Sequence, residues 1–222
     1  MYVGCFCSPV PFEVASMEIL YEDSRIAVCI KPPGVLSTDE PGGMPELLRT
    51  QLKTACIRTV HRLDRVTGGI MVFARSRMAA SILSEQVRSG TLQKEYLAVL
   101  HGAPSPRTGT LDTLIGRRAD KKRMKVVEPG GVGQRAVSHW EVLARHGAAA
   151  LVEFKIETGR THQIRVHAAH LGHPVFGDRL YGVPDRASRL LLHAVQLEFP
   201  HPVTGKPLVF AAEPPPEIVY AG

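Results

Sequence analysis

The sequence predicts an α+β protein built on a mixed, largely antiparallel sheet. Stretches in which apolar and polar residues alternate, as in half-buried strands, outnumber the stretches that have helical spacing. The length of 222 residues fits a single domain, or one domain in two lobes that share a cleft. A chain of this size can bury a sizeable core without disulfides or metal ions.

The first two strands are predicted within residues 18–30, on either side of a turn at residues 22–24. Apolar side chains at alternate positions from Ile26 to Ile30 indicate one buried face. The sequence KPPG at residues 31–34 ends this pair, because proline has no N–H to donate to a sheet. Further strands are expected at residues 70–74, 94–101, 134–144, 149–157, 189–199 and 207–211, and the last two should form a hairpin.

Three segments have the spacing of helices. The clearest covers residues 77–89, where apolar residues recur on one face, Ser76 suits the N-cap and Gly90 suits the C-terminal end. The other two helices are expected near residues 45–53 and 161–171.

The charge balance of the chain is basic, with a net charge of +6 and a pI of about 9.3. Such a balance favours an anionic partner, such as nucleic acid or an acidic membrane surface. No apolar run approaches the roughly 18–20 residues that a membrane-spanning helix requires. We therefore expect a soluble, cytoplasmic protein that spans no membrane.

The N-terminal residues 1–16 lack the charged and apolar regions of a secretory signal. Periodic structure starts only after Met17, which could itself be the start of translation. We predict a loose tail over residues 1–16 and one folded domain over residues 17–222. The four cysteines have neither a C-x-x-C pair nor zinc-ligand spacing, so free thiols are expected.

The densest group of polar side chains lies at residues 61–69, HRLDRVTGG. Asp64 precedes a glycine-rich turn that leads into the next predicted strand, so rigid backbone can hold its carboxylate at the edge of a cleft. His61, Arg62 and Arg65 would surround it with positive charge. That charge keeps a carboxylate ionised and attracts phosphates, which makes His61 and Arg62 candidate substrate-binding residues. The alternative is an aspartate that only organises the turn.

A second group lies at residues 158–165, TGRTHQIR. On the helix expected there, Ile164, Ala168 and Leu171 would form the buried stripe. Arg165 is offset from that stripe, so it is either a solvated helix arginine or a guanidinium that points into a cleft. A catalytic carboxylate needs a partner that keeps it charged and fixed, and arginine is a permanent, bidentate one.

The third candidate is Tyr96, which faces one side of the strand predicted at residues 94–101. A tyrosine ring can stack on a base that has left its helix, and its hydroxyl can move a proton. The alternative is an ordinary half-buried strand tyrosine.

A metal site is a competing interpretation of the histidines. His167, His170 and His173 are spaced by three residues, with His162 nearby. No acidic residue accompanies them in a metal-site motif, and Gly172 should end the helix before His173. We therefore predict no bound metal.

Three strings in this sequence resemble, in order, the motifs of the RluA-type family of pseudouridine synthases. They are HRLDRVTGG at 61–69, QKEYLAV at 93–99 and TGRTHQIRVHAAHLGHPVFGDRLYG at 158–182. The KPPG step also resembles the entry segment of that family. The resemblance implies the pseudouridine synthase fold, in which two lobes of a mixed, largely antiparallel sheet flank a central RNA-binding cleft. It also implies isomerisation of specific uridines in rRNA, tRNA or both.

The resemblance implies a role for each matching side chain. Asp64 would be the catalytic aspartate that breaks and remakes the glycosidic bond, and Arg165 would be its salt-bridge partner. Tyr96 would stack on the target uracil and is a candidate for removing the C5 proton. Arg62 would help to extrude the base, and Ile164 would line the apolar floor beneath it.

Many relatives carry a small RNA-binding domain of the S4 type before the catalytic domain, and too few residues precede Ile19 to hold one. The catalytic domain is then expected to grip RNA itself. The basic run at residues 117–125, which includes Lys121, Lys122 and Arg123, is the candidate phosphate grip; otherwise it is a solvated loop.

Pseudouridine formation detaches uracil from C1′, turns it and reattaches it through C5. It involves no redox change or group transfer, so we expect no cofactor, and we expect a monomer. Asp64 could attack covalently or assist a glycal route by removing the 2′ proton. A rival interpretation is an RNA-binding chaperone that has lost catalysis, but the presence of Asp64, Tyr96 and Arg165 together argues against it.

Overall fold

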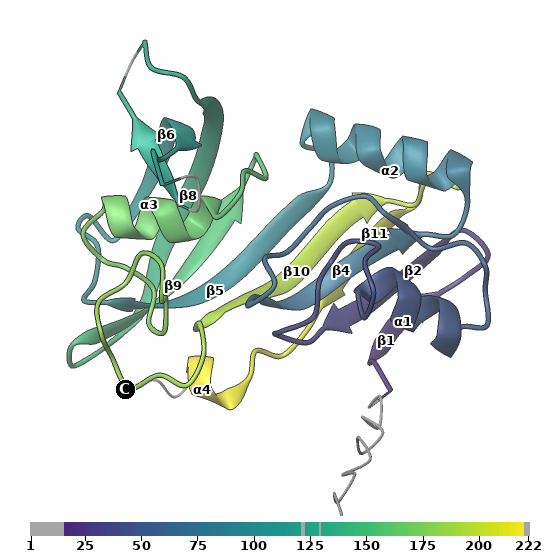
Figure 1. Ribbon diagram of the computed structural model, residues 1–222, viewed down its shortest axis with the longest axis horizontal. Helices are drawn as coiled ribbons and strands as arrows, with labels where there is room; N and C mark the ends of the chain where they lie inside the picture. Colours follow the sequence, from purple (N-terminus) through teal and green to yellow (C-terminus); the bar gives the residue numbers. More distant parts are fainter. Residues whose placement is uncertain (1–15, 121–122, 129, 220–222) are drawn as a thin grey trace, which may run out of the picture.

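The computed structural model describes residues 16–120, 123–128 and 130–219, and one sheet of 11 strands forms the core of the protein (Figure 1). The strands are β1 (Ile19–Glu22), β2 (Ile26–Lys31), β3 (Arg58–Thr59), β4 (Gly68–Ala74), β5 (Gln93–His101), β6 (Thr108–Arg117), β7 (Met124–Val127), β8 (Gln134–His146), β9 (Ala149–Ile156), β10 (Leu192–Pro200) and β11 (Pro207–Ala211). The helices are α1 (Met44–Gln51), α2 (Arg77–Ser89), α3 (Gln163–His170) and α4 (Pro216–Val219).

The order across the sheet is β1-β2-β4-β10-β5-β9-β8-β6-β7, with β3 beside β4 and β11 beside β10. Among these strands only β4 and β10 pair in parallel, and every other pairing is antiparallel. The predicted α+β architecture on a mixed, largely antiparallel sheet is therefore confirmed.

The sheet passes through two lobes (Figure 1). One lobe holds β1, β2, β4 and β11 together with α1 and α2, and the other holds β6 to β9 with α3. The neighbouring strands β5 and β10 run between them, so the two lobes share one hydrogen-bonded sheet.

Strand β4 is buried along its whole length because it has helices on both faces. Ile70 and Val72 pack in an apolar cluster with Leu83 of α2. Met71 and Phe73 belong to the main core, which also includes buried residues of α1. This two-sided burial explains why the segment reads as an unbroken apolar run. It also makes β4 a rigid exit for the loop that carries Asp64.

The predicted ends of α2 are confirmed, since the Ser76 hydroxyl accepts a hydrogen bond from the Ala79 N–H and Gly90 is left-handed. The prediction for residues 103–125 missed two strands, because β6 and β7 lie in segments taken as a connection and a basic loop. The strand β6 is polar and has little apolar alternation, and its eight register pairs with β8 outweigh that weak local signal.

The predicted tail at residues 1–16 lies outside the described residues except for Ser16. Among the helices that the structure describes, none has the length and apolar character needed to cross a membrane.

Gly69 is the second residue of β4 and lies at a point where only glycine fits. Its φ is +124°, and a Cβ there would lie 2.2 Å from the carbonyl oxygen of Ala194 on β10. Gly69→Ala should therefore lower the free energy of unfolding by more than about 3 kcal/mol, measured by urea denaturation. The matched control is Gly147→Ala, which has a left-handed φ of +56° but no atom within 4 Å of the added Cβ. Equal losses in the two variants would contradict this account.

Candidate active site

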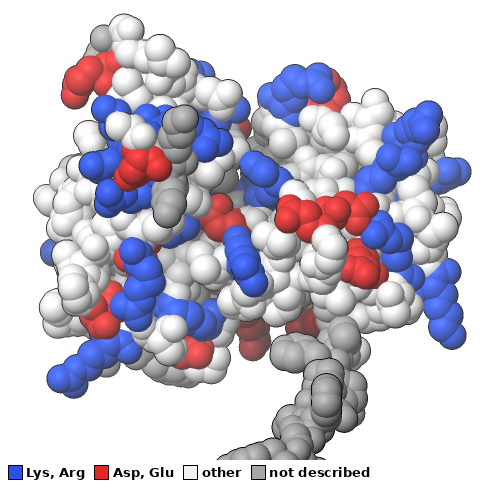
Figure 2. All heavy atoms as spheres, viewed as in Figure 1, with Lys and Arg blue, Asp and Glu red and all other residues white. Residues whose placement is uncertain are grey.

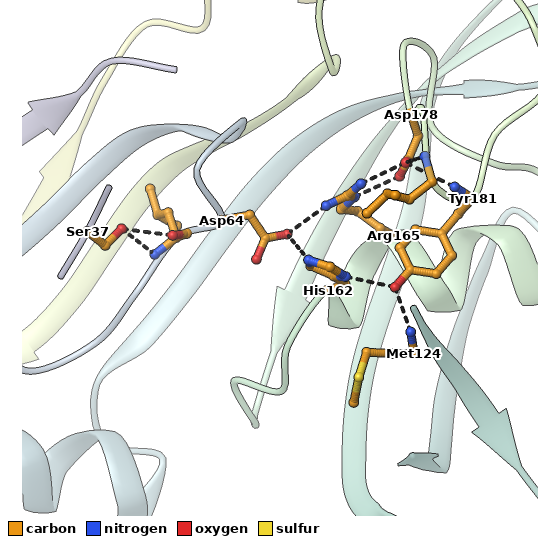
Figure 3. Close-up of polar contacts among 9 residues, drawn as sticks. Ser37, Asp64, Met124, His162, Arg165, Asp178 and Tyr181 are labelled. Carbon is orange, nitrogen blue, oxygen red and sulfur yellow. Dashed lines mark hydrogen bonds and ion pairs between the residues drawn. The ribbon is translucent and has the colours of Figure 1, made fainter. Parts of the chain in front are cut away.

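The loop between β3 and β4 presents Asp64, and contacts on both sides of the aspartate hold it. The Ser37 hydroxyl donates to the Leu63 carbonyl at 2.8 Å and accepts from the Leu63 N–H at 3.1 Å (Figure 3). On the other side, the Arg65 carbonyl accepts from the Gly34 N–H at 2.7 Å. These bonds fix the backbone next to Asp64, so its side chain leaves a rigid support.

A fully buried lysine strengthens the second contact. The Lys31 ammonium donates to the carbonyls of Pro32, Val35 and Arg65 at 2.7–3.1 Å. Burial lowers the pKa of Lys31 to about 8, while the Asp64 charge acts in the opposite direction. Sequence reasoning treated the KPPG step as a strand end that resembles the entry segment of the family, and gave its lysine no role. Its lysine in fact ties that turn to the loop of Asp64.

Arg165 on α3 lies between two carboxylates (Figure 3). Its Nη1 is 3.2 Å from Asp64 Oδ2, and its Nε and Nη2 each lie 2.7 Å from an oxygen of Asp178. The structure thus brings together Asp64 and Arg165, which are 101 residues apart in the chain. Burial acts to lower the pKa of Arg165, but the ion pairs with Asp178 and Asp64 raise it above its usual value.

Asp178 was missed in the sequence analysis, although it lies within the third family-like string. Its side chain is completely buried, and it also accepts hydrogen bonds from the N–H groups of Leu180 and Tyr181. Burial acts to raise the pKa of Asp178, yet Arg165 and these two N–H groups hold it below its usual value. A bidentate partner of this kind fixes the guanidinium in the plane that faces Asp64.

His162 and Tyr181 form a second link to Asp64. The His162 Nδ1 lies 2.7 Å from the Tyr181 hydroxyl, which also accepts from the Met124 N–H (Figure 3). The other ring nitrogen, Nε2, is 3.9 Å from Asp64 Oδ2. Burial lowers the pKa of His162, which favours the neutral ring.

Two connected cavities open at Asp64. The smaller one, of about 450 Å³, is lined by Asp64, Tyr96, Ile164 and Arg165, and both Tyr96 and Ile164 are buried. The larger one, of about 1360 Å³, continues from it past Arg62. Figure 2 shows a hollow between the two lobes with basic side chains on both of its sides. The smaller cavity therefore has an apolar floor and a carboxylate at its edge.

The prediction that His61 adds positive charge around Asp64 is wrong. Its ring is buried, its Nε2 accepts the Val72 N–H at 3.1 Å, and burial, helped by the charge of Lys94, lowers its pKa to about 3. His61 is therefore a neutral part of the core beneath the loop. Arg62 and Arg65, which flank the aspartate in the loop, are exposed.

Of the three basic residues predicted to bind phosphate, the structure describes one. Lys121 and Lys122 lie outside the described residues. Arg123 is present, and its Nε donates to Asp120 at 2.8 Å, which offsets its charge.

Two of the histidines considered as metal ligands form hydrogen bonds with other groups of the protein. His167 is buried, with Nδ1 bonded to Ser138 and Nε2 bonded to Thr113. His173 Nδ1 contacts the carbonyl of His101. In the part of the chain that the structure describes, no three His, Cys, Asp or Glu side chains gather in a way that could hold a metal ion.

Comparison with known proteins identifies the family of the chain. The sequence profile described as RNA pseudouridylate synthase matches residues 25–170, which is most of the chain. This protein belongs to the RNA pseudouridylate synthase family. This synthase is 37% identical to the Bacillus subtilis protein named uncharacterized RNA pseudouridine synthase YhcT, over 93% of the chain and 71% of that relative. It is 38% identical to the ribosomal large subunit pseudouridine synthase D of Xylella fastidiosa, over 91% of the chain and 67% of that relative.

A solved structure agrees with this assignment. Human RNA pseudouridylate synthase domain containing 4 superposes with a TM-score of 0.76 and 28% identity, covering 91% of this chain and 90% of that one. The synthase is therefore an isomerase that converts uridine in RNA to pseudouridine, and its pseudouridine synthase fold is the one that the sequence predicted.

The buried Arg165–Asp178 pair should be essential for stability. Asp178→Asn replaces the buried, bidentate carboxylate with a neutral amide and leaves only the single, partly exposed contact with Asp64, so we expect a loss of about 3 kcal/mol in the free energy of unfolding by urea denaturation. The matched control is Asp112→Asn, which breaks an exposed bidentate pair with Arg135 and should cost much less. Similar losses for the two variants would show that burial does not govern the pair.

Buried neutral histidines should make stability fall in mild acid. Burial lowers the pKa of His61 to about 3 and of His167 to about 4, from 6.5 in the unfolded chain. The unfolded state therefore binds the extra protons, and stability decreases as the pH falls from 6.5 towards 4. The slope is up to roughly 1.4 kcal/mol per pH unit for each ring.

Urea denaturation of His167→Asn between pH 7 and pH 5 should show a shallower slope than the unmodified protein. The exposed His146, replaced in the same way, serves as the control and should leave the slope unchanged. If the free energy of unfolding of His167→Asn had the same pH dependence as that of the unmodified protein, His167 would not contribute to the loss of stability in acid.

Proposed function

We propose that this synthase isomerises uridine in ribosomal RNA with Asp64 as its catalytic carboxylate. The observation that carries this proposal is the position of Asp64. It lies on a loop fixed on both sides, in contact with a buried guanidinium, and at the edge of a pocket that Tyr96 and Ile164 also line. A carboxylate held in this way needs little reorganisation when the glycosidic bond breaks.

Asp64 acts on the sugar side of the bond, either by attack on C1′ or by removal of the 2′ proton. In both routes the carboxylate must stay charged and keep its direction. Arg165 supplies the charge, and Asp178 prevents the guanidinium from turning away. His162 Nε2 lies 3.9 Å from the same Asp64 oxygen.

Tyr96 is the stacking partner of the uracil in this proposal. Burial, reinforced by the Asp64 charge, raises the pKa of Tyr96 above its usual value, so the side chain is a neutral phenol at neutral pH. A neutral phenol accepts a proton poorly, which favours stacking over direct removal of the C5 proton. Ile164 forms the floor below the ring.

The uridine has to leave its helical stack before it can enter the pocket, at a cost of a few kcal/mol. Arg62 is exposed and lines both cavities, so it is placed to occupy the space that the base vacates. The reaction returns uracil to the same ribose, and therefore it requires no cofactor. One chain supplies all of these groups, which supports a monomer.

The name of the Xylella fastidiosa relative assigns that protein to the large ribosomal subunit, which supports rRNA over tRNA as the substrate here. Ribosomal RNA also agrees with the cytoplasmic location expected from the sequence. We test the choice by incubating the protein with large-subunit rRNA, small-subunit rRNA and tRNA transcripts. Chemical tagging that marks pseudouridine but not uridine should locate product in the large-subunit transcript. Product in tRNA alone would overturn the substrate assignment and leave the chemistry intact.

Asp64→Asn should lower the rate of product formation by roughly 10³-fold or more, because the amide can neither attack nor accept a proton. Its affinity for the same transcript, measured by filter binding, should stay within about threefold, since its phosphate contacts are unchanged.

Asp39→Asn is the matched control, because Asp39 is exposed and pairs with Arg49 outside the pocket. This control should react at the unmodified rate. Asp64→Asn with full activity would end the proposal.

A further inference from the structure

Lys94 is a buried cation that the site described so far does not use. It lies on β5 two residues before Tyr96, so both side chains project from the same face of the strand. Only 6% of Lys94 is exposed. Within the described residues, its Nζ has neither a hydrogen-bond acceptor nor a carboxylate within ion-pair distance.

The other buried lysine provides the contrast. Lys31 is equally enclosed, but three carbonyl oxygens receive its protons. Burial without such partners is unfavourable for an ammonium, and an unpaired one is retained only where something else compensates. Burial alone lowers the pKa of Lys94 to about 8, so the group is still mostly charged at neutral pH.

The surroundings of Lys94 do not supply a counter-charge. Asp64 pairs with Arg165 instead, and no ion pair joins Lys94 to this or another carboxylate of the described residues. The nearby His61 is neutral. Gly159 leaves the approach open, because a Cβ at that position would come within 3.3 Å of the Lys94 Nζ.

The position of Lys94 indicates what its partner is. Lys94 lines both the smaller cavity, which holds Tyr96, and the larger one that continues from it. Arg62 and Arg160 also line both cavities. An RNA strand whose uridine enters the smaller cavity must carry its backbone through this junction, and the groups it brings there are phosphates.

We propose that Lys94 Nζ binds the non-bridging oxygens of an RNA phosphate adjacent to the flipped uridine. The site is formed before RNA arrives, since the strand fixes the lysine stem and the glycine leaves space for the phosphate. This inference rests on the proposed function, because it requires the uridine to occupy the pocket of Asp64 and Tyr96.

The first test compares Lys94→Met, Lys94→Arg and the matched control Lys206→Met, which removes an exposed lysine in the turn between β10 and β11. The probe is the rRNA transcript that is modified in the mapping experiment. Lys94→Met should weaken binding about tenfold and reduce the slope of log Kd against log salt by about 0.7, the value for one phosphate on single-stranded RNA. Lys94→Arg should retain most of the affinity, and Lys206→Met should change neither quantity.

The second test changes the RNA, and its main measurement uses the unmodified protein, so that measurement does not depend on the folding of any variant. Each phosphate flanking the target uridine is replaced in turn by an uncharged methylphosphonate. One replacement should weaken binding by the unmodified protein about tenfold and have no further effect on Lys94→Met. If no flanking phosphate matters to the unmodified protein, the inference is wrong.

The outcomes separate this inference from the proposed function. A Lys94→Met variant with normal affinity and salt slope but a low rate at saturating RNA would overturn the phosphate site and assign Lys94 to the chemistry. Failure of the proposed function would instead appear as product formation that does not depend on Asp64, whatever Lys94 does.

Discussion

The guanidinium of Arg165, held between Asp64 and Asp178, is the contact on which the site depends. It joins the loop before β4 to helix α3 and to the segment after that helix, so three distant parts of the chain meet at one group. Asp178 takes two of its hydrogen-bonding nitrogens, and Asp64 receives the third. The two aspartates therefore have different tasks. The buried one fixes the arginine, while the partly exposed one remains available to a substrate.

The rest of the fold supplies what this contact requires. The buried strand β4 and the bonds from Ser37 and Lys31 determine where Asp64 leaves the backbone. On the opposite side, Tyr181 orients His162, and the Cζ of Arg165 lies over the Tyr181 ring, 5.2 Å from its centre. Each group that touches Asp64 is thus held by a further group that does not. Such layered support reduces the freedom of the carboxylate without neutralising it.

Much of this arrangement could be predicted from the sequence. The periodicity of α2 and its capping residues predicted that helix to the residue, and the family-like strings predicted that Arg165 would lie beside Asp64. Strand β6 could not be predicted, because its stability comes from pairing with β8 rather than from its own residues. The role of His61 was misjudged for a related reason. A histidine next to arginines looks cationic in a sequence, and only the fold reveals that its ring is buried.

Asp178 and Lys31 show a different limit. Both carry out their function through partners that are close in space and unremarkable in the sequence, namely a guanidinium from α3 and a set of backbone carbonyls. No spacing rule identifies a lysine whose acceptors are carbonyl oxygens. Membership in a family-like string was the one signal available for Asp178, and it did not specify the partner.

The unbroken sheet has a consequence for how RNA is chosen. Because β5 and β10 are hydrogen-bonded neighbours that extend between both lobes, swinging one lobe away from the other would rupture a row of backbone bonds. We therefore expect the two lobes to keep their relative positions, so that the RNA has to bend to enter the cleft. RNA loops and bulges, where a pyrimidine is weakly stacked and paired, bend with the smallest loss of free energy. We therefore expect the synthase to discriminate between RNAs by how easily they deform as well as by the nucleotide sequence around the uridine.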